Sequence, residues 1–192
     1  MFKRVLVLIA CLFVLSSSGV SAMNMKSFSS DSKIVEALSM LENIGAHEIF
    51  DNLQYNSVKI MFYDLSQISF SYHKHFAVNT TDTWGNRYIL INTKYKNAPT
   101  EQIACLIAHE SCHKARVATL EEETNATRTE ARYWMILKKH NVNYSKSALL
   151  ARLDGLVNLE HSSTVGQDYI QDKISNSRFY QSQLAVRERR TF

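Results

Sequence analysis

Residues that break helices are rare in this chain. One proline and five glycines interrupt 192 residues, although proline and glycine are the residues that most strongly end or bend a helix. Hydrophobic residues make up 45% of the chain and charged residues 21%, the composition of an ordinary globular protein. A chain of this length forms one domain with its own core. We therefore expect a single, largely helical domain over residues 23–192.

The first 22 residues have the pattern of a signal peptide. Lys3 and Arg4 form a short basic region, and the apolar run 5–15 that follows is too short to span a membrane. Small side chains then lead to Ala22, after which we expect cleavage. This predicts an exported protein, periplasmic or extracellular, whose mature chain has no membrane span. The alternative is a lipoprotein anchored at Cys11, but that cut would leave a very short apolar core before it.

The mature chain carries little net charge. The formal net charge is +4, and two of the positive charges, Lys3 and Arg4, belong to the predicted signal peptide. The remainder predicts neither a nucleic-acid partner nor binding to a membrane surface. Cys105 and Cys112 remain after cleavage, and on one helix their spacing corresponds to about 10 Å, too far for a disulfide.

The order of apolar patterns predicts an α+β fold. We expect residues 23–30 to form a loose leader and Asp31 to cap a helix that buries Ile34, Leu38 and Leu41. β-Branched and aromatic residues then predict strands at 57–65, 69–79 and 87–92. Further helices are expected from Thr100 onward and over residues 121–140, 145–159 and 165–177. The result would be a small three- to four-stranded sheet packed on the helix that starts near Thr100, followed by a helical C-terminal half.

The helix expected from Thr100 contains the sequence His109-Glu110-Ser111-Cys112-His113, which has the form H-E-x-x-H. Histidines four residues apart project from one helix face and can supply two corners of a zinc tetrahedron. Glu110 lies about 100° around the helix from His109. That offset keeps Glu110 off the metal but beside a water bound there, so we expect it to act as general base and acid. Chance would produce this motif in a chain of this composition about once in seventy sequences.

A third metal ligand is expected from the acidic segment that follows the motif. The continuation H-x-x-G-x-x-H is absent, because Arg116 stands at the glycine position. Glu123 begins the pattern E-x-x-A, and the small Ala126 would allow its helix to approach the motif helix closely. We take Glu123 as the third ligand. Glu122 and then Glu130 remain the alternatives.

Together these motifs resemble the gluzincin branch of the zincin metallopeptidases, above all its small single-domain members, over the segment 57–134. The resemblance implies a zincin-like fold and a zinc-dependent hydrolase that cuts amide bonds in a peptide or protein. The peptides of peptidoglycan are among the substrates left open. Gluzincins often carry an aspartate four residues after the glutamate ligand. Here that position is Thr127, so the support for a zinc histidine would be built differently, with Glu130 as one candidate.

The resemblance also implies features of a substrate cleft. The strand 88–92 would border the cleft as an edge and bind a peptide through backbone hydrogen bonds, although an ordinary buried strand is an equal alternative. A side chain from a later element would stabilise the oxyanion. The candidates for that role are Tyr169, Tyr180, His161 and Arg178.

Two other functions remain open at this point. The first is a non-catalytic binding or regulatory module on a zincin scaffold with a structural zinc, because a chain this small leaves few residues to build substrate pockets. The second is a structural exported protein in which the motif occurs by chance.

Overall fold

The computed structural model describes residues 23–114, 118–140, 142–164, 166–178 and 180. The predicted signal peptide and the alternative cleavage site at Cys11 lie outside the described residues. Within these ranges, no helix is both long and apolar enough to cross a membrane.

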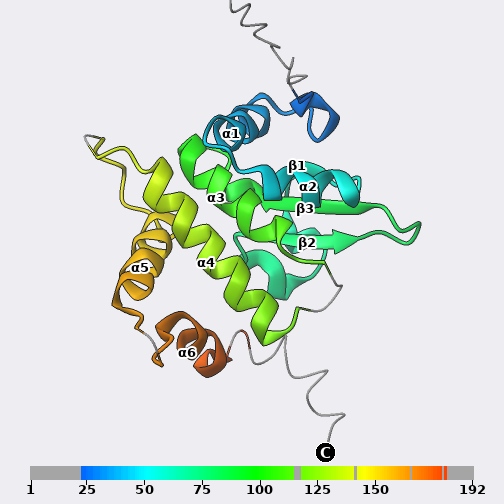
Figure 1. The fold of residues 1–192 in the computed structure, drawn as a ribbon. Coiled ribbons are helices and arrows are strands. Elements are labelled where there is room, and N and C mark those ends of the chain that lie inside the picture. Colours follow the sequence, from blue (N-terminus) through cyan, green and yellow to red (C-terminus); the bar gives the residue numbers. More distant parts are fainter. Residues whose placement is uncertain (1–22, 115–117, 141, 165, 179, 181–192) are drawn as a thin grey trace, which may run out of the picture.

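The described residues form an α+β fold in which a small sheet lies among helices (Figure 1). The strands are β1 (Lys59–Tyr63), β2 (Ala77–Thr81) and β3 (Arg87–Asn92). The helices are α1 (Ser32–Asn43), α2 (His47–Tyr55), α3 (Thr100–Ser111), α4 (Leu120–Leu137), α5 (Ala148–Ser162) and α6 (Tyr169–Asn176). Short 3-10 helices lie at Met25–Ser27, Leu65–Gln67, Phe70–Lys74 and Thr93–Tyr95.

The sheet has three strands in the order β1-β3-β2, within the predicted range of three to four. β3 pairs in parallel with β1 and antiparallel with β2. The expectation that the strand 88–92 forms an edge is therefore wrong, because β3 is the central strand and β1 and β2 are the two edge strands. The reason is visible in the composition of β3: Ile89, Leu90 and Ile91 are all buried, so both faces of this strand are covered, as in a central strand.

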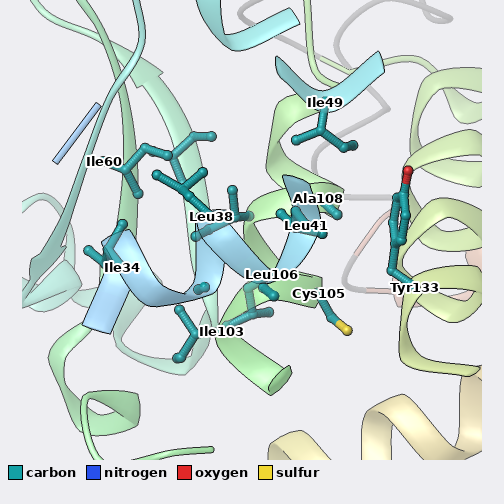
Figure 2. Close-up of a cluster of buried hydrophobic side chains, with 14 of the residues drawn as sticks. Ile34, Leu38, Leu41, Ile49, Ile60, Ile103, Cys105, Leu106, Ala108 and Tyr133 are labelled. Atoms are coloured by element: carbon teal, nitrogen blue, oxygen red, sulfur yellow. The ribbon is translucent and has the colours of Figure 1, made fainter. Parts of the chain in front are cut away.

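Helix α1 forms as its sequence predicts. Oδ1 of Asp31 accepts hydrogen bonds from the backbone N–H groups of Lys33 and Ile34, which caps the helix. Ile34, Leu38 and Leu41 are fully buried. Figure 2 shows these three side chains beside α3 and β1 in the main hydrophobic core. Gly45 follows the helix with a φ of +75°, the left-handed conformation that ends many helices.

The N-terminal segment is not a loose leader. Met25 and Phe28 are buried in the main core, and the carbonyl of Phe28 accepts a hydrogen bond of 2.8 Å from the N–H of Ile60 in β1. The N–H of Met23 donates to Oε1 of Glu42 over 3.3 Å. The prediction failed because the segment looks polar, whereas its two buried apolar side chains fix it to the domain.

Two other local predictions differ from the structure. Residues 70–74 form a 3-10 helix capped by Ser69, so the predicted strand 69–79 is confirmed only from Ala77 onward. Helix α2 was not predicted, although it buries Ile49, Phe50 and Leu53. Several of its polar residues, such as Asp51 and Asn52, have weak helix propensity, so it forms because its apolar side packs against the core.

The arrangement of the later helices positions the candidate site. α3 lies between the sheet and α4, and α4 lies between α3 and α5, with α6 packed against α4 (Figure 1). Every side chain of α3 from Glu101 to Ser111 is buried. α3 is therefore the central helix of the domain, and the motif occupies its C-terminal end.

Candidate metal centre

The motif helix begins as predicted but ends earlier. Pro99 precedes the first turn of α3, and the helix ends at Ser111, so His113 lies beyond it. The N–H groups of Cys112 and His113 bond to carbonyls three residues back, those of His109 and Glu110. A final turn tightened in this way is common where the last carbonyls of a helix lack partners. The two histidines therefore do not both belong to regular α-helix.

The two imidazole rings nevertheless meet at one place with a carboxylate from α4. The ring centroids of His109 and His113 are 5.2 Å apart. Nε2 of His109 lies 3.8 Å from Oε2 of Glu123, and Nε2 of His113 lies 3.6 Å from Oε1 of the same carboxylate. These three residues offer ligand atoms within 4.8 Å of one another, and all three are buried. Among the described residues, this group could hold a metal ion.

The two alternative carboxylates occupy supporting positions. Glu122 accepts a hydrogen bond from the N–H of Lys114, and its Oε1 lies 3.9 Å from Nδ1 of His113. Glu130 faces the other histidine, with Oε2 at 3.1 Å from Nδ1 of His109. Both therefore approach the nitrogen that would face away from a metal ion. The geometry favours Glu123 over both as the third ligand.

Glu130 is fully buried and is held by an arginine from α5. Nε and Nη2 of Arg152 donate to its two carboxylate oxygens over 3.0 and 2.6 Å. Burial alone would raise the pKa of Glu130, but Arg152 and then His109 lower it to about 2. Glu130 is therefore an ionised acceptor beside Nδ1 of His109, the arrangement that orients many metal-binding histidines. This agrees with Glu130 supporting a histidine in place of the missing aspartate at Thr127.

His113 is held in its neutral form. Burial, and then the nearby charges of His109 and Arg87, lower its pKa to about 3. A neutral imidazole is the form that coordinates metals.

Glu110 is also buried, yet its carboxyl group makes no hydrogen bond to the described residues. Burial raises its pKa to about 7, against the effect of His109, which lowers it, and together with that of Glu123, which raises it. A carboxyl group with this pKa can both take up and release a proton near neutral pH.

Two observations on the described residues fit a divalent cation. Oε2 of Glu123 is buried without a hydrogen-bond partner, although buried carboxylate oxygens are normally paired. Three carboxylates, Glu110, Glu123 and Glu130, are buried at the site, and Arg152 pairs with one of them, Glu130. Fully ionised, these groups carry two net negative charges, which a divalent cation would neutralise.

The four candidates for oxyanion stabilisation differ in whether they lie at the site. Tyr169 is 41% exposed, and His161 and Arg178 are exposed as well. The hydroxyl of Tyr180 instead accepts a hydrogen bond of 3.4 Å from Nη1 of Arg152. Burial raises the pKa of Tyr180, and the charges of Glu123 and Glu130 contribute to the same direction. Of the four, Tyr180 is the one that contacts the site.

Three residues of the site escaped the sequence analysis. Arg152 left a signal, because it is a charged residue in the otherwise apolar stretch 148–153. Asn79 and Arg87, which bond to the end of α3, left none, because nothing in their local sequence relates them to the motif.

Comparison of the chain with protein-family models, with curated proteins and with solved structures gives no match.

We predict that Arg152→Met lowers the free energy of unfolding by about 3–5 kcal/mol, because it removes the arginine that pairs with the buried charge of Glu130 and leaves only His109 beside it. Urea unfolding followed by circular dichroism, in the presence of a chelator, measures the change. Arg128→Met is the control, since Arg128 pairs with Asp168 near the surface and its loss should cost about 0–1 kcal/mol. Equal losses in both variants would contradict the prediction.

Proposed function

We propose that this protein is an exported zinc-dependent peptidase. The observation that carries the proposal is that His109, His113 and Glu123 meet at one buried point. Glu110, which directly follows His109, adds a buried carboxyl group without a hydrogen-bond partner among the described residues. Two imidazoles, a carboxylate and a nearby general base are the smallest set of groups with which a zinc hydrolase can work.

The donor set supports zinc as the metal. Zinc prefers nitrogen and oxygen ligands at about 2.0–2.1 Å in tetrahedral geometry, which places the ligands about 3.4 Å from one another. The observed separations of 3.8 and 3.6 Å involve the two different oxygens of Glu123. With one ligand atom from each residue, the atoms lie within 4.8 Å of one another, so they need to approach by at most about 1.4 Å. The described residues supply three ligands rather than four. A structural zinc site is usually closed by four protein ligands, whereas a catalytic site keeps one position open.

The chain's own residues have separate roles in the proposed reaction. When bound, zinc polarises the substrate carbonyl and lowers the pKa of a coordinated water to about 7. Glu110 removes the proton from the attacking water and later delivers it to the leaving amine. The Tyr180 hydroxyl donates a hydrogen bond to the oxyanion that develops on the substrate. The ionised Glu130 keeps the ring of His109 in its binding orientation.

The edge strand β2 offers a place for an extended substrate. β2 pairs on one side only, with β3, and Nδ2 of Asn79 in this strand donates to the carbonyl of Glu110 over 2.8 Å. β2 therefore runs next to the motif. A peptide added along its open side would bind through backbone hydrogen bonds, which suits protein substrates and peptidoglycan peptides alike.

Export belongs to the same proposal. Its support is the basic and apolar pattern of residues 1–22 and the small residues before Ala22.

A second candidate function is a binding or regulatory module with a structural zinc. The observation in its favour is the low exposure of the group: His109, Glu110, His113 and Glu123 are between 5% and 8% exposed. Little of the site faces solvent, as in a site that serves stability alone. The two functions differ in whether zinc-loaded protein hydrolyses anything.

We predict that the purified mature protein holds about one equivalent of zinc and that Glu123→Gln loses most of it, because an amide is a poor zinc ligand. Glu122→Gln, one residue away, should retain the metal, since Glu122 bonds to the N–H of Lys114 instead. Mass spectrometry after dialysis measures the metal content of the wild type and of both variants. Wild-type protein that stays folded and metal-free in the presence of zinc would end the proposal.

We predict that Glu110→Gln keeps the zinc but lowers kcat by about 10²–10⁴-fold, the usual contribution of a general base. The assay uses zinc-loaded protein against a panel of unstructured proteins, peptides and cross-linked peptidoglycan fragments. Glu121→Gln is the matched control, because Glu121 is exposed beside the site and should leave turnover unchanged. If zinc-loaded wild-type protein cuts no member of the panel, the binding module becomes the better explanation.

We predict that Tyr180→Phe lowers kcat by about 10²–10³-fold, as the loss of one oxyanion donor does, with little change in KM. Tyr169→Phe removes a hydroxyl from an exposed side chain and serves as the control. A rate equal to that of the wild type would remove Tyr180 from the reaction while leaving the role of Glu110 intact.

A further inference from the structure

The two histidines of the motif are held in different ways. His109 lies within α3, and Glu130 is 3.1 Å from its Nδ1. His113 lies beyond the end of α3, and the carboxylate nearest its buried Nδ1 is further away than Glu130 is from Nδ1 of His109. Glu122 is 3.9 Å from that nitrogen, beyond hydrogen-bond distance. Neither regular helix nor a partner for its ring therefore fixes His113.

The sheet supplies the missing constraint through the backbone of His113. Nη2 of Arg87, at the start of β3, donates to the carbonyl of His113 over 2.7 Å. Nδ2 of Asn79 in β2 donates to the carbonyl of Glu110 over 2.8 Å and to that of His113 over 3.4 Å. These carbonyls are among those that a helix end leaves without partners. Two side chains from the sheet thus cap α3 at the point where the ligand leaves the helix.

The cap is itself held in place. Nη2 of Arg87 also donates to Oδ1 of Asn79 over 3.1 Å, and its Nη1 donates to Oδ1 of Asn56 over 2.8 Å. Asn56 ends α2, and its own Nδ2 donates to the carbonyl of Asn52 over 2.8 Å. The guanidinium group is thereby fixed by acceptors from three different elements. A planar group with several donors in fixed directions suits this task, whereas an ammonium group cannot span the same acceptors.

We propose that Arg87 and Asn79 are positioning residues of the metal centre, which hold the backbone of His113 so that its Nε2 meets Glu123 and Nε2 of His109. The inference rests on the proposed function, since it assumes that these three residues bind zinc. Its physical basis is that metal affinity depends on ligands held in place before the metal arrives. The carbonyl contacts do this for His113, as Glu130 does for the ring of His109.

Zinc affinity of the folded, metal-free protein tests the proposal, measured by competition with a chromogenic chelator. We expect Arg87→Lys to raise the Kd for zinc about 10- to 100-fold, the range seen when residues that support a metal ligand are lost. The cobalt-loaded variant should also show an altered visible spectrum, because the geometry around the ion changes. Arg132→Lys is the matched control, since Arg132 pairs with Glu48 away from the site and its affinity should equal that of the wild type.

A second variant keeps the proposal testable if Arg87→Lys fails to fold. Asn79→Asp retains an oxygen for Arg87 but loses the amide donor to the carbonyls of Glu110 and His113, so we expect a smaller rise in Kd, about 10-fold. If either folded variant binds zinc and cobalt as the wild type does, the residues serve only the fold and the proposal is overturned. Wild-type protein without affinity for zinc would instead overturn the proposed function itself.

Discussion

The contact between α3 and α4 is the constraint on which the rest of the structure depends. It brings two histidines from the end of one helix to a carboxylate in the first turns of the next. Ala108 on α3 and Ala126 and Ala131 on α4 are fully buried, and side chains this small allow two helices to approach closely. The histidines and carboxylates at this contact are buried because both helices are covered. The sheet covers α3, and α5 covers α4.

Because the carboxylates of the site are buried, the balance of charge there affects the stability of the fold. Buried carboxylates are costly unless each finds a partner. Glu130 has Arg152, whereas Glu110 and Glu123 have raised pKa values because burial disfavours their charged forms. A dication would supply the partner that Glu123 lacks. The features that make the site suited to a metal are therefore the same features that make the metal-free protein electrostatically unfavourable, and metal binding should stabilise the fold.

Features of the fold that depend only on neighbouring residues could be predicted from the sequence. The cap at Asp31, the buried side of α1 and the start of α3 after Pro99 follow from neighbouring residues, and the structure agrees with all three. The choice of Glu123 over its neighbours also came from helical spacing. The position of His113 past the helix end was not predictable, because the cap that holds it comes from strands more than twenty residues away. The unbroken apolar run of β3 is typical of a central strand, which was one of the two alternatives for this segment, whereas the resemblance implied an edge.

The contact of Met23 with Glu42 has a consequence for how the chain matures. If a signal peptidase cuts after Ala22, the N–H of Met23 that donates to the Glu42 carboxylate becomes an ammonium group. A neutral hydrogen bond then turns into a charge-assisted one, available only to the processed polypeptide. The chain end would dock two residues before the buried Met25, whereas an amino-terminal fusion or an uncut precursor would keep only the neutral hydrogen bond. Proteolytic processing would thus strengthen the attachment of the first mature residues to the domain as well as release the chain.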